Sequence, residues 1–207
     1  MRGLLLVIEG IDGAGKTTQA ERLAQALTSQ GHDVVRSSEP TNGPHGTRLR
    51  QSMAQGRLEP EEELELFLAD RLDHVTNLIL PSLKSGKMVI LDRYYFSTVA
   101  YQGVRGFEPD TLLARNEAFA PEPDLLFILD LDPGAGLTRI HQGRAAGADA
   151  FEVPELLARS RTLFLELARR KSYAHVIDAL EEPDVIAANL KSKVDQLRQT
   201  PTGPGTL

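Results

Sequence analysis

The stretch Leu4–Leu27, LLLVIEGIDGAGKTTQAERLAQAL, decides how this 207-residue chain is interpreted. Its apolar beginning, Leu4–Glu9, is typical of a strand covered on both faces, and the residues after Gly15 have the spacing of an amphipathic helix. Between these two segments, residues 10–17 match the pattern G-x-x-x-x-G-K-[ST] in full. A buried strand before the pattern and a helix after it are the context in which it forms a phosphate-binding loop. The stretch therefore predicts a nucleotide site.

The backbone of this loop suits phosphate chemistry. Its glycines permit backbone angles that other residues avoid, so that successive N–H groups point at phosphate oxygens, and the helix that follows adds the positive end of its dipole. We expect Lys16 to contact the β- and γ-phosphates and the Thr17 hydroxyl to bind Mg²⁺. The alternative is a glycine-rich turn that only joins strand to helix. The nucleotide-binding residues predicted here are Gly10, Ile11, Asp12, Gly13, Ala14, Gly15, Lys16, Thr17 and Thr18.

Short apolar runs and longer segments with helical spacing alternate along the rest of the chain. The expected strands are Leu4–Glu9, Asp33–Ser37, Lys87–Leu91, Asp124–Leu131 and Ala174–Asp178. The expected helices are Lys16–Gln30, Pro60–Ser85, Asp110–Phe119, Gly134–His141, Pro154–Arg170 and Pro183–Leu197. This alternation predicts an α/β protein with a P-loop NTPase fold, in which helices flank a five-stranded parallel sheet. We expect one domain over residues 1–199, with a short lid at about 142–152, and a flexible tail at 200–207.

Composition excludes several classes of protein. Lysine and arginine number 23 and aspartate and glutamate 29, which gives a net charge of −6 and argues against a nucleic-acid binder. The absence of cysteine rules out disulfides, thiolate nucleophiles and thiolate metal sites. The first apolar run is too short for a signal peptide, and no run approaches 18 apolar residues. We therefore expect a cytoplasmic protein without nucleic-acid or membrane partners.

Two charged residues follow the apolar run 88–91. Asp92 is expected at the carboxyl end of a strand, where a carboxylate can hold Mg²⁺ through water or accept a proton. A helix cap or an ordinary surface aspartate is the alternative. Arg93 has a planar guanidinium that suits an anionic phosphoryl group, although a lone arginine also forms surface ion pairs.

Arg71 occupies an apolar position of the helix expected at Pro60–Ser85. It lies four residues after Phe67 and seven after Leu64, where an aliphatic residue is expected. With Phe67 it could stack on and hydrogen-bond a planar ligand such as a nucleobase. Alternatively, its stem packs in the core and its guanidinium reaches a carboxylate such as Asp73. If Arg71 contacts a base, Arg71→Leu should keep or raise stability while raising KM for the ligand.

Four motifs occur in an order that resembles thymidylate kinases. They are residues 7–27, the Glu39-Pro40 turn, FLADR at 67–71 and DRYYFSTVAYQG at 92–103, and the likeness extends from about residue 3 to 185. The resemblance implies Mg²⁺-dependent transfer of the γ-phosphoryl group of ATP to dTMP, giving dTDP, in a homodimer whose protomers contain a five-stranded parallel sheet. A kinase for another deoxynucleotide or nucleoside, or a non-catalytic nucleotide-binding module, are the alternatives.

The resemblance implies how the acceptor nucleotide is bound. Phe67 would stack on thymine, Arg71 would hydrogen-bond the edge of the base, and Gln102 would bond nearby. Asp12 would reach the sugar, and Tyr101 would crowd the position of a ribose 2′-hydroxyl. Tyr101 and Ser97 could instead be ordinary packing and turn residues. The substrate-binding residues implied in this way are Asp12, Glu39, Arg50, Phe67, Arg71, Arg93, Ser97, Tyr101 and Gln102.

The resemblance also implies which residues act on the phosphoryl group. Arg93 would bind the dTMP phosphate, and Asp92 would serve the metal or the acceptor oxygen. The catalytic residues implied are Lys16, Asp92, Arg93 and Arg144, and the metal ligands are Thr17 and Asp92.

The lid departs from the family pattern. Residues 12–14 of the phosphate loop carry no arginine, so the lid is expected to supply a cation for the transferred group. Alanine stands at position 150 where arginine is expected, which leaves Arg144 and Arg139 as candidates. The alternative for Arg144 is a solvated surface charge.

A second departure precedes Glu39. The family often has arginine at this position, whereas this chain has Ser38. Arg48 or Arg50 could compensate by approaching the acceptor phosphate.

Overall fold

The computed structural model describes residues 2–143 and 153–199. Its centre is a five-stranded, entirely parallel sheet in the order β2-β3-β1-β4-β5. The strands are β1 (Leu5–Glu9), β2 (Val34–Ser38), β3 (Met88–Asp92), β4 (Leu125–Asp130) and β5 (Ala174–Asp178). All five predicted strands are present, with bounds shifted by one residue at several ends. The predicted α/β fold class is confirmed.

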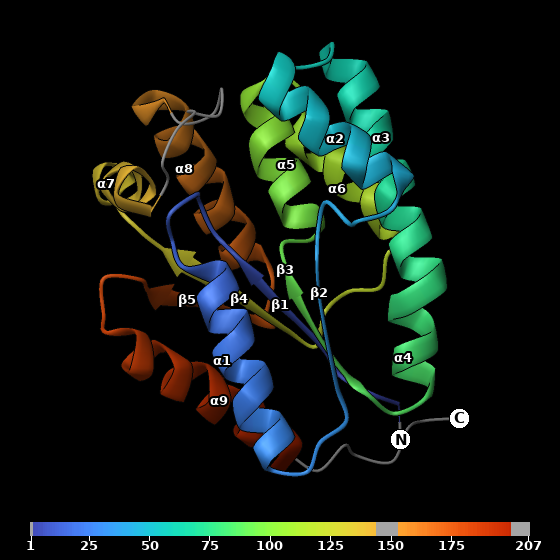
Figure 1. The fold of residues 1–207 in the computed structure, drawn as a ribbon, viewed down its shortest axis with the longest axis vertical. Coiled ribbons are helices and arrows are strands. Elements are labelled where there is room, and N and C mark those ends of the chain that lie inside the picture. The colour runs from blue at the N-terminus through green and yellow to red at the C-terminus, as the bar shows by residue number, and fades with distance from the viewer. Residues whose placement is uncertain (1, 144–152, 200–207) are drawn as a thin grey trace.

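Helices cover both faces of the sheet, as Figure 1 shows. Their bounds are α1 (Lys16–Ser29), α2 (Pro44–Gln55), α3 (Pro60–His74), α4 (Leu80–Lys84), α5 (Tyr95–Val104), α6 (Pro109–Glu117), α7 (Pro133–Gly143), α8 (Pro154–Arg170) and α9 (Pro183–Gln199). Helix α1 packs against α9 on one face, and α5 packs against α8 on the other. Several helices begin with proline, whose missing N–H is not needed in the first turn.

The long helix expected at Pro60–Ser85 is interrupted. Helix α3 ends at His74, a π-helical turn occupies Val75–Ile79, and α4 follows directly. The continuous apolar stripe of this segment gave no sign of the break. Two further helices, α2 and α5, lie where no helix was expected. Nearly every residue of α5 is buried, so this helix has no exposed polar face of the kind that usually marks a surface helix.

The register of the central strands decides where the functional residues meet. In β1 and β3 every residue is buried, and Ile8 pairs with Asp92. The carboxyl ends of the two strands therefore lie side by side, and the loop that begins at Gly10 emerges next to Arg93.

Two expectations concern segments that the structure does not fully describe. The proposed lid at about 142–152 falls outside the described residues from position 144 onward, and the tail at 200–207 falls outside them entirely. Within the described ranges, no helix is long and apolar enough to cross a membrane.

Candidate active site

Two glycines of the phosphate loop lie in close contact with backbone from other elements. A Cβ at Gly10 would come within 2.5 Å of the Leu129 carbonyl oxygen, and one at Gly13 within 2.4 Å of the Gly136 carbonyl oxygen on α7. Both glycines also have positive φ, 139° and 81°. Side chains at these two positions are therefore excluded by space and by conformation. The loop is held in shape by the end of β4 and by α7.

A polar cavity lies over this loop. It is lined by Asp12, Gly13 and residues 15–18 of the loop and, from other elements, by Asp92, Arg93, Arg139 and Ile140. Lys16 is buried at its base, and its Nζ donates to the Ile11 carbonyl oxygen at 2.8 Å. Burial, reinforced by the nearby Arg93, lowers the pKa of Lys16 to about 8. A bound polyphosphate would supply the negative charge that favours the protonated lysine.

Thr17 and Asp92 form a pair at the edge of the polar cavity. The Thr17 hydroxyl donates to Asp92 Oδ2 at 2.5 Å. Asp92 Oδ1 is buried and has no hydrogen-bond partner among the described residues. Mg²⁺ binds through one or two protein oxygens, waters and substrate phosphates, so a hydroxyl, a carboxylate and a phosphate loop fit this ion. Asp92 is thus a buried acceptor beside the phosphate loop.

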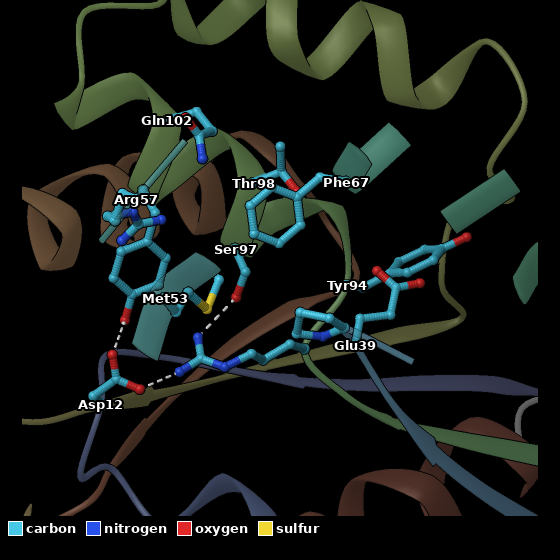
Figure 2. Close-up of a pocket in the computed structure, with 12 residues that line it drawn as sticks. Asp12, Glu39, Met53, Arg57, Phe67, Tyr94, Ser97, Thr98 and Gln102 are labelled. Atoms are coloured by element: carbon cyan, nitrogen blue, oxygen red, sulfur yellow. Dashed lines mark hydrogen bonds and ion pairs between the residues drawn. The ribbon is translucent and has the colours of Figure 1, made fainter. Parts of the chain in front are cut away.

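A second cavity, of about 190 Å³, opens beside the first. Its walls combine aromatic and apolar side chains with several polar ones: Asp12, Glu39, Pro40, Met53, Arg57, Phe67, Arg93, Tyr94, Ser97, Thr98, Tyr101 and Gln102. Figure 2 shows the Phe67 ring beside Thr98, with Asp12 at the opposite end. Asp12 and Arg93 line both cavities, so the two spaces meet at these residues. The second cavity suits a planar ring linked to an anionic group.

Arg93 is fixed at this junction. Its guanidinium forms an ion pair with Asp12 and donates to Ser97 Oγ at 3.1 Å. Tyr101 donates to Asp12 Oδ2 at 3.1 Å, and its ring lies 5.4 Å from the Arg93 guanidinium carbon. Burial disfavours the charged guanidinium, but Asp12 and the other surrounding groups outweigh it and raise the pKa of Arg93. Arg93 therefore stays charged where the cavities join.

The backbone of Arg93 is unusual. Its φ is 70°, and it is the one non-glycine residue in the described ranges with positive φ. Such a conformation in an arginine persists where the surrounding contacts hold it, and it often marks a functional site. Here it turns the chain from β3 towards α5 and directs the side chain to Asp12.

Arg71 is buried behind the wall of the second cavity. Its Nε and NH2 donate to Glu39 Oε2 at 2.9 and 2.6 Å, NH1 donates to Asn116 Oδ1, and NH2 also donates to Thr98 Oγ1. The guanidinium of the buried Arg71 thus reaches a carboxylate, in line with the alternative given above, but this carboxylate is Glu39 and not Asp73. The residue does not line the cavity, but Glu39 and Thr98 do.

These contacts also correct the expected effect of Arg71→Leu. The substitution would leave Glu39 buried with its main cationic partner removed, so a kept or raised stability is no longer expected. His74 Nδ1 remains 2.9 Å from Glu39 Oε1, and its Nε2 lies 2.8 Å from Ser37 Oγ.

Gln102 belongs to a second buried network. Its Nε2 donates to Glu63 Oε2 at 2.8 Å, and Glu63, fully buried on α3, also pairs with Arg57 and Arg105. Arg57 lines the second cavity with Gln102. Sequence reasoning missed Arg57 and Met53 because they belong to α2 and its following loop, where no element was predicted.

Tyr94, Thr98 and Pro40 were also missed as lining residues. All three lie inside or beside motifs already singled out. Each directly follows a residue that the sequence had already indicated as substrate-binding: Arg93, Ser97 and Glu39. This adjacency was the signal that could have identified them.

The remaining predicted cations lie elsewhere. Arg50 is exposed, donates to the Pro40 carbonyl oxygen at 2.8 Å and does not line the second cavity. Arg48 pairs with Glu62 on the surface. Arg139 lines the polar cavity. Arg144 and Ala150 lie outside the described residues.

Comparisons with known proteins agree with this geometry. The family model described as Thymidylate kinase matches residues 8–189. A thymidylate kinase of Xanthomonas euvesicatoria pv. vesicatoria is 50% identical over 99% of this chain and 92% of its own length. One of Xanthomonas oryzae pv. oryzae is 53% identical over 89% of this chain and 79% of its own length. One of Xylella fastidiosa is 50% identical over 89% of this chain and 83% of its own length.

Proposed function

The chain belongs to the thymidylate kinase family, and on this premise we propose that it transfers the γ-phosphoryl group of ATP to dTMP, giving ADP and dTDP. The observation that carries the proposal is the meeting of two cavities at Asp12 and Arg93. One cavity lies over a phosphate loop, and the other has an aromatic wall. A donor and an acceptor nucleotide bound in them would bring their phosphates together at this junction.

The donor phosphates are proposed to lie over the loop. The backbone N–H groups of residues 10–18 and the N-terminus of α1 would hold them, and Lys16 would contact the β- and γ-phosphates. Arg139, which lines the same cavity, is placed to add positive charge. Arg144 stays a predicted catalytic residue from the sequence.

The acceptor is proposed to lie in the second cavity. Its base would pack against Phe67 near Gln102, and its sugar would lie near Asp12 and Tyr101. The contact of Arg71 with the base stays a prediction, supported by its position directly behind Thr98. Glu39 and Ser97 line the same cavity, whereas Arg50 reaches it only through the Pro40 carbonyl.

Catalysis by these residues would consist of positioning and charge stabilisation. Phosphoryl transfer requires little covalent chemistry from the protein. Arg93 would bind the acceptor phosphate and stabilise the charge that develops on the transferred group, together with Lys16. Asp92 would accept hydrogen bonds near the acceptor oxygen.

Thr17 and Asp92 are the residues that would hold Mg²⁺. When bound, the ion would neutralise negative charge on the phosphate oxygens. The buried and unsatisfied Asp92 Oδ1 supports this assignment.

A panel of acceptors tests the proposed function. ADP release is measured by an enzyme-coupled assay with ATP, Mg²⁺ and one of dTMP, dUMP, dCMP, UMP or thymidine. We expect the highest kcat/KM with dTMP. Equal or higher turnover of another acceptor would contradict the dTMP assignment, and nucleotide binding without turnover of any acceptor would indicate a binding module. Lys16→Met, purified in parallel, controls for contaminating kinases.

We also propose, from the family resemblance, that the chain forms a homodimer and is located in the cytoplasm. Leu72 on α3 and Leu80 on α4 are large apolar side chains that are 49% and 36% exposed, which supports an interface on this side of the molecule. Sedimentation velocity should show a species of twice the monomer mass. A monomer at micromolar concentration would contradict the dimer.

A further inference from the structure

Glu9 is a fully buried carboxylate at the last position of β1, directly before the phosphate loop. Among the described residues, the three hydrogen bonds to its carboxylate all come from the segment that follows Arg93. The Tyr94 N–H and the Ser97 N–H donate to Oε1 at 2.8 and 3.0 Å, and the Ser97 hydroxyl donates to Oε2 at 2.6 Å. One carboxylate thus connects the end of β1 to the beginning of α5.

The first role of these bonds is to cap α5. The first N–H groups of a helix have no partner within it, and the N-cap residue Tyr94 offers no side-chain acceptor. Glu9 supplies that acceptor from a neighbouring strand, and its negative charge also suits the helix N-terminus. Because α5 carries Ser97, Thr98, Tyr101 and Gln102, this cap fixes one wall of the second cavity.

The second role concerns Arg93 itself. The Tyr94 N–H held by Glu9 belongs to the peptide directly after Arg93, where the backbone has a φ of 70°. The Ser97 hydroxyl gives its proton to Glu9 and accepts from Arg93 NH1 at 3.1 Å. Glu9 therefore contacts both ends of the turn that directs Arg93 towards the junction of the cavities.

We propose that Glu9 is a positioning residue, which holds Arg93 and the N-terminus of α5 in the arrangement that binds the acceptor phosphate. The proposal rests on the proposed function, because it assigns a role in binding dTMP. Glu9 lines neither cavity, and it acts through Ser97 and the backbone of Tyr94.

Glu9→Gln tests the proposal with a side chain of the same size. The amide oxygen still accepts from the two backbone N–H groups, but the amide nitrogen cannot accept from Ser97. The Ser97 proton then turns away. At pH 8, above the pKa of about 7 that burial gives Glu9, Arg93 loses both an oriented acceptor and a nearby negative charge. We expect KM for dTMP to rise about 10-fold, as for one lost charge-assisted hydrogen bond, while KM for ATP changes by less than about 2-fold.

Ser97→Ala provides a second variant, since it removes only the hydroxyl that joins Glu9 to Arg93. It should raise KM for dTMP to a similar extent, and the double variant should show less than the sum of the two effects, because both break the same connection. Glu65→Gln, which removes an exposed charge from α3, should leave both KM values unchanged.

The outcomes separate the two proposals. Absence of dTMP turnover by the wild-type chain would overturn the proposed function and the role of Glu9 with it. Normal wild-type turnover with an unchanged KM for dTMP in folded Glu9→Gln would overturn the role of Glu9 alone. An equal rise in KM for dTMP and KM for ATP would also overturn it, because such a change indicates general disruption of the site. Should Glu9→Gln not fold, an unchanged KM for dTMP in Ser97→Ala decides against the proposal.

Discussion

The unfolding free energies of the wild-type chain and of Glu9→Gln should diverge as the pH rises from 4.5 to 7. Burial raises the pKa of Glu9 from 4.5 to about 7, although Ser97, Arg93 and Tyr94 favour the ionised form. In this window the folded chain holds a proton on Glu9 that the unfolded chain has released, so the contribution of Glu9 to wild-type stability falls as the pH rises. At about 1.36 kcal/mol per pH unit, a pKa change from 4.5 to about 7 amounts to roughly 3 kcal/mol. Glutamine does not titrate, so the free energy of unfolding of Glu9→Gln does not fall for this reason.

The measurement is urea-induced unfolding of both proteins, followed by circular dichroism because the chain contains no tryptophan. The series covers pH 4.5 to about 7.5. Lys16 and Arg93 both face Glu9, and burial lowers the pKa of Lys16 to about 8. The series stops at about 7.5 because Lys16 itself begins to lose its proton above that pH. Contributions from groups that do not interact with Glu9 cancel in the difference between the two proteins. Glu65→Gln controls for the lost charge, and a difference between wild type and Glu9→Gln that stays constant across the series would refute the reasoning.

Three further predictions concern Arg71, the phosphate loop and the metal. Arg71→Leu should lower the free energy of unfolding by about 3–5 kcal/mol, because it leaves Glu39 buried without its arginine, and wild-type stability in urea would contradict this. Gly13→Ala should weaken ATP binding about 10-fold or more in calorimetry, since its Cβ would lie 2.4 Å from the Gly136 carbonyl oxygen. An unchanged Kd would show that α7 can move aside at little energetic cost. Removal of Mg²⁺ with EDTA should abolish turnover. Thr17→Ala should need about 10-fold more Mg²⁺ than the wild-type chain to reach half of its maximal rate. An identical Mg²⁺ requirement would show that Thr17 does not bind the metal.

The sequence predicts those features that depend on local patterns. The strands were found because parallel strands buried on both faces appear as continuous apolar runs, and the phosphate loop because its glycines, lysine and threonine have fixed spacing. Helix α5 was not predicted from its pattern, because it is buried almost all round. The π-helical turn at Val75–Ile79 leaves the apolar stripe uninterrupted and has no comparable signal.

The site was predicted less completely where partners are far apart in the chain. Arg71 was recognised as unusual, but its partner Glu39 lies 32 residues away and is brought close only by the packing of α3 beside the end of β2. The bond between Glu9 and Ser97 spans 88 residues and depends on the pairing of β1 with β3. Residue spacing carries no information on such contacts, so Glu9 could be interpreted only as the end of a strand.

The contact between Gly13 and α7 limits where positive charges can be placed around the phosphate loop. An arginine at position 13 would place a cation inside the phosphate loop, but the Gly136 backbone already occupies the space that its Cβ would need. An arginine at position 13 would therefore require α7 to move. Three residues further along the same helix, Arg139 already lines the cavity over the loop. The same helix therefore excludes a side chain at position 13 of the loop and places a cation, Arg139, beside the cavity over that loop.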